Sequence, residues 1–158
     1  MPSSFKCRID IDVSNPDYSD ASIPLGQVAR KIAESSRRNI RTQTSIKGHA
    51  FKGLSVKTIK DKRREGSDYP TRALYRKGIM YRAIHVYQRS KNAFEVGIIP
   101  RGKPKRDLVG YIHQEIYPII RAFLGFDAKS RQWSKERFRR WMKERKEKAK
   151  RTKSTYSY

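Results

Sequence analysis

The sequence predicts an α+β fold: a small, mainly antiparallel sheet packed by a long N-terminal amphipathic helix and a C-terminal helix, with long polar loops. Three observations lead to this expectation. A strict apolar–polar alternation opens the chain, a helical stripe of apolar residues follows, and two β-rich runs flank a polar turn in the middle of the chain.

Length and charge limit the possible functions. The 158 residues suffice for one domain with a modest core. Lys and Arg number 38 against 15 Asp and Glu, giving a formal net charge of +23. Such an excess implies a negatively charged partner: nucleic acid, an acidic protein surface or anionic lipid. No apolar run approaches the roughly 20 residues that span a bilayer, and no leader pattern opens the chain, so we expect neither a membrane partner nor export.

The first strand and the first helix have the clearest patterns. Apolar residues alternate with charged ones from Phe5 to Val13, which predicts a half-buried strand containing the single cysteine, Cys7. One cysteine excludes an internal disulfide and a cysteine-cluster metal site. Ser22 is the expected cap of a helix that runs to about Thr42. Its apolar stripe follows helical spacing: Leu25, Val28, Ala29, Ile32, Ala33, Ser36 and Ile40.

Basic residues lie mostly off that stripe and continue into the next segment. On the helix they are Arg30, Lys31, Arg37, Arg38 and Arg41, either a solvated face or a surface for a polyanion or acidic subunit. Residues 45–71 form a long basic loop in which Phe51 and Leu54 are apolar anchors and Ser55 can cap a helical turn. Its candidate contacts to a polyanion or an acidic partner are Lys57, Lys60, Arg63 and Arg64, next to Lys62. No aromatic residue interrupts this run, so base stacking is not indicated.

A hairpin and a second basic loop follow. Tyr81–Tyr87 and Ala93–Ile99 are predicted antiparallel strands joined by the turn Gln88–Asn92. The loop behind them lacks the spacing of a phosphate-cradling P-loop. Contact with a phosphate backbone or an acidic neighbour stays open for its basic residues: Arg101, Lys103, Lys105 and Arg106.

The most apolar stretch, Val109–Phe126, is expected to organise the core. Helical spacing at its start gives way at Pro118, which pushes the preceding residue to extended backbone. Ile119–Phe126 is then predicted to be an apolar strand or extended arm closed by Gly125, and we expect the part near Ile119–Phe123 to join the sheet as its fourth strand.

The last helix should start at Asp127 or Ser130 and place Trp133, Arg137, Phe138, Trp141 and Met142 near one face. We therefore place a single α+β domain at residues 1–142 and a basic helical arm at 143–158, frayed at its end. The arm is either a solubilising tail or a segment that orders against another subunit or DNA. Its candidate contacts are Lys143, Arg145, Lys146, Lys150 and Arg151.

The sequence shows no catalytic constellation. His49, His85 and His113 are far apart without metal-ligand spacing, and there is no acidic cluster for Mg²⁺. His113 and Arg121 are expected to be hydrogen-bonded core or interface residues. We expect no enzyme activity and no cofactor.

Two motifs resemble those of the phage virion morphogenesis family, the tail-completion proteins of Mu-type contractile-tailed phages. One is Gly48-x-x-Phe51-x-x-Leu54-Ser55-x-x-Thr58. The other combines the following residues: Tyr111, His113, Gln114, Pro118, Arg121, Phe123, Leu124 and Gly125. Compared with the family's motif, this chain lacks a Gly after Gln114 and has one extra residue between Pro118 and Arg121.

The resemblance implies a structural virion protein at the head–tail junction or the top of the tail, assembled in the host cytoplasm. Its expected partners are copies of itself in a ring and neighbouring neck, connector, tail-terminator or tail-tube proteins, and possibly packaged DNA. The rival function is a basic nucleic-acid-binding module of the ribosomal-protein or nucleoid type. It predicts basic residues on one continuous face with exposed aromatic side chains.

Overall fold

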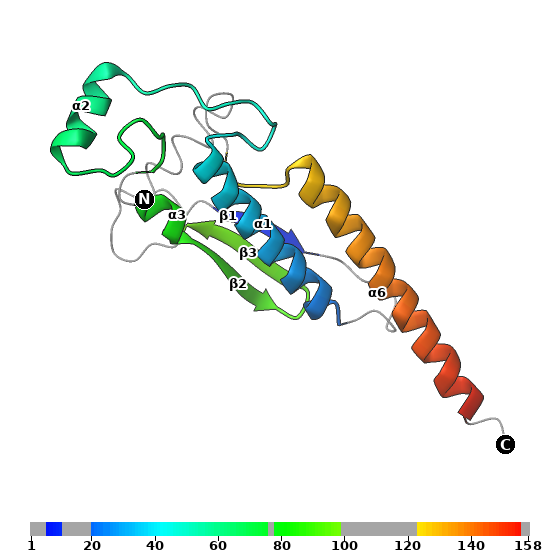
Figure 1. The fold of residues 1–158 in the computed structure, drawn as a ribbon. Coiled ribbons are helices and arrows are strands. Elements are labelled where there is room, and N and C mark those ends of the chain that lie inside the picture. Colours follow the sequence, from blue (N-terminus) through cyan, green and yellow to red (C-terminus); the bar gives the residue numbers. More distant parts are fainter. Residues whose placement is uncertain (1–5, 11–19, 76–77, 99–122, 156–158) are drawn as a thin grey trace.

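The computed structural model describes residues 6–10, 20–75, 78–98 and 123–155. Within them, three strands form one antiparallel sheet in the order β1-β3-β2, with bounds β1 Lys6–Asp10, β2 Ile84–Ser90 and β3 Ala93–Ile98. Four helices accompany the sheet: α1 Ser22–Thr42, α2 Val56–Arg64, α3 Ile79–Ala83 and α6 Ala128–Thr155. The predicted α+β class is confirmed (Figure 1).

The central strand is β3, which pairs with a neighbouring strand along both of its edges. Val96 pairs with Cys7 of β1 on one side and with Val86 of β2 on the other. Every described β3 residue except Glu95 is buried. The hairpin between β2 and β3 turns at Lys91 and Asn92, and a register shift between Gln88 and Ser90 marks an irregularity before the turn.

The hairpin was predicted in the correct place, but its first strand begins later than expected. Residues 81–83 belong to α3, which starts after Gly78 at φ 65°. A positive φ suits glycine because it lacks a Cβ, so Gly78 lets the chain turn sharply into this short helix. β2 then continues to Ser90, into the predicted turn. The aromatic and β-branched residues of Tyr81–Tyr87 therefore did not reveal the helical turn.

The long helix α1 covers one face of the sheet, and its bounds match the prediction. All seven residues of the predicted apolar stripe are buried. At Gly26 a Cβ would lie 3.2 Å from Cζ of Phe94, so the helix approaches β3 closely. Ser22 is not the cap, contrary to prediction. Instead Asp20 Oδ1 accepts a hydrogen bond from the Ser22 backbone N–H at 3.1 Å, and Asn92 Oδ1 accepts one from the Ala21 N–H at 3.0 Å.

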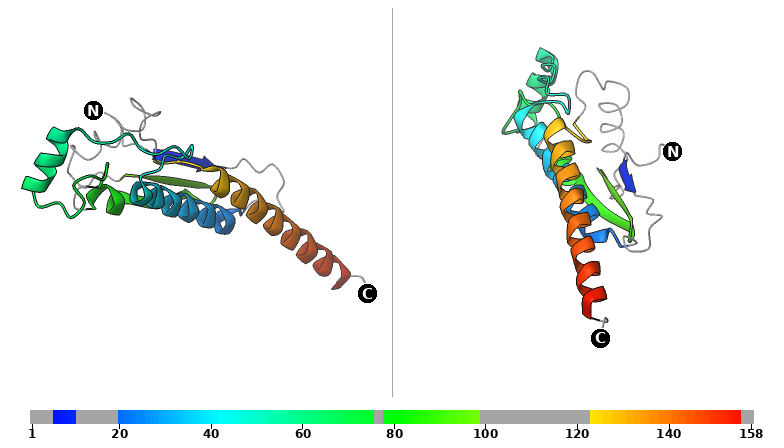
Figure 2. Two further views of the ribbon diagram at one scale, coloured as in Figure 1. Left: turned by 45° about the horizontal axis from the view of Figure 1, so that its top comes forward. Right: turned by 90° about the vertical axis from the view of Figure 1, so that its right-hand side faces the viewer.

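The C-terminal helix α6 runs antiparallel beside α1 and then extends past the start of α1 (Figures 1 and 2). Trp141 is buried at 7% exposure, with Trp133 and Phe138 packed against the same core. Met142 was predicted near that face but is 42% exposed, because one residue along a helix turns the side chain by about 100°.

The predicted fourth strand is not formed by the part that the structure describes. Residues 119–122 lie outside the described residues, and 123–126 form a bend. Phe123 and Leu124 are both buried, at 0% and 2% exposure. Consecutive strand residues point to opposite faces of a sheet, so in a half-buried strand one of two adjacent side chains would be exposed. Here both side chains are buried, which fits a segment that fills the core better than a half-buried strand. The sequence predicted that the apolar segment Val109–Phe126 is buried, and this is confirmed for Phe123 and Leu124.

The region 45–71 contains more regular structure than the predicted loop. α2 spans nine residues and begins at the predicted cap, where Ser55 Oγ accepts a hydrogen bond from the Thr58 N–H at 3.2 Å. The predicted anchor Phe51 is buried, and Leu54 packs partly against the same core.

Candidate interaction surfaces

Several candidate residues lie outside the part of the chain that the structure describes. From the second motif these are Tyr111, His113, Gln114, Pro118 and Arg121, and from the second basic loop Arg101, Lys103, Lys105 and Arg106. The remaining motif residues, Phe123, Leu124 and Gly125, lie directly before α6. They join the core to the start of that helix.

Gly125 and Asn39 shape this connection. Gly125 has φ 136°, a conformation that favours glycine, and it turns the chain from the buried Leu124 toward Asp127. Asn39 is 5% exposed on α1, and its Nδ2 donates to the Phe123 carbonyl oxygen at 3.4 Å. Phe123, Leu124 and Gly125 of the second motif therefore belong to the core and its connection to α6 rather than to an exposed site.

Asp127 fixes the N-terminus of α6 to α1. Its Oδ1 accepts a hydrogen bond from the Ser130 N–H at 2.6 Å, the expected geometry of a helix cap. Its Oδ2 accepts from Arg38 Nη2 at 2.9 Å and from the Ser35 hydroxyl. One carboxylate thus caps one helix and binds two side chains of another.

The environment of Asp127 lowers its pKa below the ordinary value of 3.8. Partial burial acts in the opposite direction and is the largest single influence, because it disfavours the charged form. Hydrogen bonds from Ser35 and Ser130, with the charge of Arg38, together outweigh it. The carboxylate is therefore ionised at neutral pH and holds its three donors.

Two arginines of α1 are structural contacts. Arg38 binds Asp127, and Arg37 Nη2 donates to the Ile84 carbonyl oxygen at 2.5 Å, where β2 begins. Lys31 Nζ lies 5.7 Å from the centre of the Trp133 ring on α6. Arg30 and Arg41 are exposed. The basic residues of α1 therefore serve largely to hold α6 and β2 in place.

The basic residues of α2 divide into one internal and four surface side chains. Lys62 is 4% exposed, and its Nζ donates to the carbonyl oxygens of Tyr69 and Arg72. The four candidate contacts are exposed: Lys57, Lys60, Arg63 and Arg64. Arg64 lies 3.7 Å from Asp61, an exposed pair of the kind that contributes little to stability.

Gln43 connects the α2 region to the end of α1. It lies just past Thr42 at φ 60°, a backbone conformation that is uncommon for a residue with a side chain. Its Nε2 donates to the Ala73 carbonyl oxygen at 3.0 Å and its Oε1 accepts from the Ala73 N–H at 2.5 Å. The two hydrogen bonds fix the chain that returns from α2.

The arm candidates of α6 are mostly exposed. Lys143, Lys146, Lys150 and Arg151 are exposed, whereas Arg145 is half-buried, with its guanidinium carbon 5.8 Å from the centre of the Trp141 ring. Among residues 142–151, none is buried. The packed part of α6 therefore ends at Trp141, one residue before the predicted domain boundary.

The α2 group and the arm group lie at opposite ends of the molecule. Figure 1 shows α2 at one end and the C-terminal half of α6 at the other, and both views in Figure 2 agree. A partner that contacts both groups must therefore extend along most of the length of the described chain. The structure therefore separates residues that the sequence grouped together as candidate contacts.

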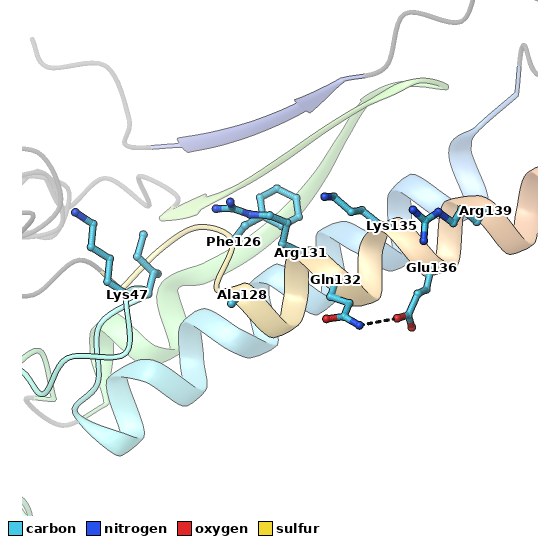
Figure 3. A pocket seen from close by; sticks show the side chains of 9 residues that line it. Lys47, Phe126, Ala128, Arg131, Gln132, Lys135, Glu136 and Arg139 are labelled. Carbon is cyan, nitrogen blue, oxygen red and sulfur yellow. Dashed lines mark hydrogen bonds between the residues drawn. The ribbon is translucent and has the colours of Figure 1, made fainter.

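A groove of about 720 Å³ opens beside the N-terminal half of α6 (Figure 3). Four basic residues line it: Lys47, Arg131, Lys135 and Arg139. Ile46 and Phe126 add apolar surface, and Gln132 and Glu136 complete the wall. The four basic residues were not among the candidates from the sequence, although the spacing i, i+4, i+8 of the three on α6 was a readable signal.

The described residues contain no group of three or more His, Cys, Asp or Glu side chains placed to hold a metal ion. His49 lies in an exposed turn after α1, and His85 lies on β2. In the described part of the chain, no helix combines the length and the apolar character needed to cross a membrane.

Comparison of the chain with protein-family models, with curated proteins and with solved structures gave no match. The family resemblance accordingly rests on the motif residues alone.

Proposed function

We propose that the chain is a ring-forming structural subunit of a tailed phage or phage-like particle, which completes the tail or neck at the head–tail junction. The observation that carries this proposal is the form of α6. A single helix belongs to the core up to Trp141 and then continues as a charged arm beyond the sheet and α1 (Figure 1).

The arm has the properties of a helix that packs against a neighbouring subunit. A helix that is polar on all sides gains little from burial within its own chain. Pairs at i, i+4, such as Glu144 with Lys148 and Glu147 with Arg151, favour its helical state. An arm that is already helical loses less conformational entropy when it docks on another subunit.

The separation of the two basic groups supports a ring. A closed ring of identical subunits repeats one contact between two different surfaces of the chain. Surfaces at opposite ends of an elongated subunit are suited to this arrangement, since each subunit can contact one neighbour at either end. The α2 region and the arm lie at two such ends (Figure 2), and because both are basic, each would contact a less basic surface of a neighbour and not the other basic end.

The rival function, a ribosomal-protein-like or nucleoid-type module, also predicts exposed aromatic side chains beside its basic face, and the described residues support that feature less well. Tyr69 is the one aromatic residue among the exposed large hydrophobic residues of the described chain, at 43% exposure. Its ring lies 4.3 Å from the guanidinium carbon of Arg72 and packs edge-on against Tyr75. It therefore already has neighbours and is a poor platform for stacking a base.

Immunolabelling of particles tests the proposal. Particles purified from cells that carry this gene, labelled with antibody to the chain and imaged in negative stain, should carry label where the tail meets the head. Antibody to a protein of the capsid shell is the control for specific position. Particles that carry capsid label but no label for this chain at the junction would contradict the proposal.

A further inference from the structure

We infer that one face of α6 is a binding surface for the phosphate backbone of duplex DNA. The face is formed by six exposed residues, named here the α6 basic stripe: Arg131, Lys135, Arg139, Lys143, Lys146 and Lys150. This inference depends on the stripe alone and holds whether or not the chain forms the proposed ring.

The stripe follows from helical geometry. Steps of four, four, four, three and four residues keep the six side chains within about 120° around the helix axis. From Arg131 to Lys150 they extend along about 28 Å, at 1.5 Å per residue. The buried residues of α6, such as Ser130, Ser134 and Trp141, lie on the opposite side. The stripe is therefore a band of cations on the outer face of one helix, which turns around the axis by about 40° at each step of four residues.

Acidic residues are excluded from this row. The three acidic residues of α6 are Glu136, Glu144 and Glu147, and their helical positions all fall outside the arc of the stripe. Glu136 accepts a hydrogen bond from Gln132 Nε2 at 3.1 Å. In Figure 3, Lys135 and Arg139 extend on one side of α6 while Glu136 points to another. A partner along the stripe therefore meets positive charge from end to end.

The groove adds a second element at the start of the stripe. Lys47 comes from the turn after α1 and faces the same space as Arg131, Lys135 and Arg139. Two segments that are far apart in sequence thus contribute cations to one concave surface. Its four cations outnumber its one carboxylate, Glu136, and a concave surface with such an excess of positive charge concentrates anions.

The composition of the stripe favours DNA over an acidic protein. Protein interfaces are depleted in lysine and have apolar, aromatic-rich centres. Four of the six stripe residues are lysines, and Met142 is the one large apolar side chain exposed within the arc. Duplex DNA presents a negative charge about every 1.7 Å along its axis, so a row 28 Å long can contact several phosphates. No aromatic residue lies within the row, which favours backbone contact over base stacking.

The test compares two variants with the same change in net charge. The stripe variant combines Arg131→Gln, Lys135→Gln, Arg139→Gln and Lys143→Gln. The matched control combines Lys57→Gln, Lys60→Gln, Arg63→Gln and Arg64→Gln on α2. Both lower the formal net charge by the same amount from +23. Binding of a fluorescent 30-base-pair duplex of mixed sequence is measured by anisotropy across a salt series.

We expect the stripe variant to bind the duplex about 100-fold more weakly near 0.1 M salt. Its plot of log K against log salt should be shallower by about 3 to 4, at about 0.9 for each lost phosphate contact. The α2 control should change affinity by about threefold or less. Glutamine has a helix propensity close to that of Lys and Arg, so α6 should remain helical, as circular dichroism will show.

A second variant avoids the packed part of α6. It combines Lys143→Gln, Lys146→Gln and Lys150→Gln, all beyond Trp141, and should lower the salt slope by about 2 to 3. Equal losses in the stripe variant and the α2 control would overturn the inference, because they would indicate diffuse charge. So would displacement of the duplex by polyglutamate at equal charge concentration, which would indicate an acidic protein partner.

Discussion

At the scale of single residues, Asp127 shows how one side chain connects elements that are remote in sequence. It caps α6 through Ser130 and binds Ser35 and Arg38 of α1. The sequence indicated Asp127 or Ser130 as the start of the helix, but no local pattern revealed the partners 92 and 89 residues away. Pairing across such separations depends on how α1 and α6 pack, which periodicity does not encode.

Asp127→Asn should destabilise the chain by about 1 to 3 kcal/mol at neutral pH, because the amide loses the charge-assisted bonds to Arg38 and Ser35. Urea unfolding measures the difference. Asp68→Asn is the matched control, since Asp68 is exposed on the loop after α2 and the substitution changes the net charge equally. Its effect should be within about 0.5 kcal/mol. Equal effects of the two substitutions would contradict the assigned role.

The same pair of variants gives a prediction for pH. The pKa of Asp127 is lowered in the folded chain, so its contribution is present above its ordinary value of 3.8 and is lost as the pH falls through the folded value. The stability difference between the native chain and Asp127→Asn should therefore be constant from pH 7 to about pH 5 and shrink below pH 4. Unfolding curves at each pH test this, and a difference that grew on acidification would refute it.

At the scale of elements, the sequence best predicted the elements in which buried residues recur at a regular spacing. α1 was predicted with its bounds and its apolar stripe because all seven stripe residues are buried and recur at helical spacing. The hairpin was found from the β-branched and aromatic residues on either side of a polar turn. The start of β2 was missed because Gly78 at positive φ begins a helical turn, and Tyr81 within this turn has strand propensity. The basic groove was missed because Lys47 joins α6 through tertiary structure alone.

The end of the packed part of α6 makes a prediction about two adjacent residues. Trp141→Ala should destabilise the chain by about 3 to 5 kcal/mol, because a 7% exposed indole leaves a cavity in the core. Met142→Ala should change stability by about 0.5 kcal/mol or less, since Met142 is 42% exposed. Urea unfolding of both variants is the measurement. A large loss for Met142→Ala would show that the packed part continues into the arm.

At the scale of the whole molecule, the elongated form reduces the repulsion that the excess of positive charge causes. The small three-stranded sheet and the two long helices provide the core, while exposed cations accumulate on α2 and along α6. Separation of the two groups to opposite ends reduces their mutual repulsion within one chain (Figure 2). The repulsion that remains within each group is screened by salt or cancelled by a partner.

Salt should therefore stabilise the isolated chain. The Debye length falls from about 30 Å at 0.01 M to about 10 Å at 0.1 M and about 3 Å at 1 M, so added salt progressively weakens the repulsion between neighbouring cations of the α6 basic stripe, which are separated by about 6 Å of axial rise. We expect the urea midpoint to rise from 20 to 300 mM NaCl, and the rise to be smaller in the stripe variant because four of the repelling charges are gone. Polyphosphate at 20 mM NaCl should reproduce the stabilisation, since a bound polyanion supplies the missing negative charge. A midpoint that fell with salt would mean that attractive pairs, rather than repulsion among cations, dominate the electrostatics of this chain.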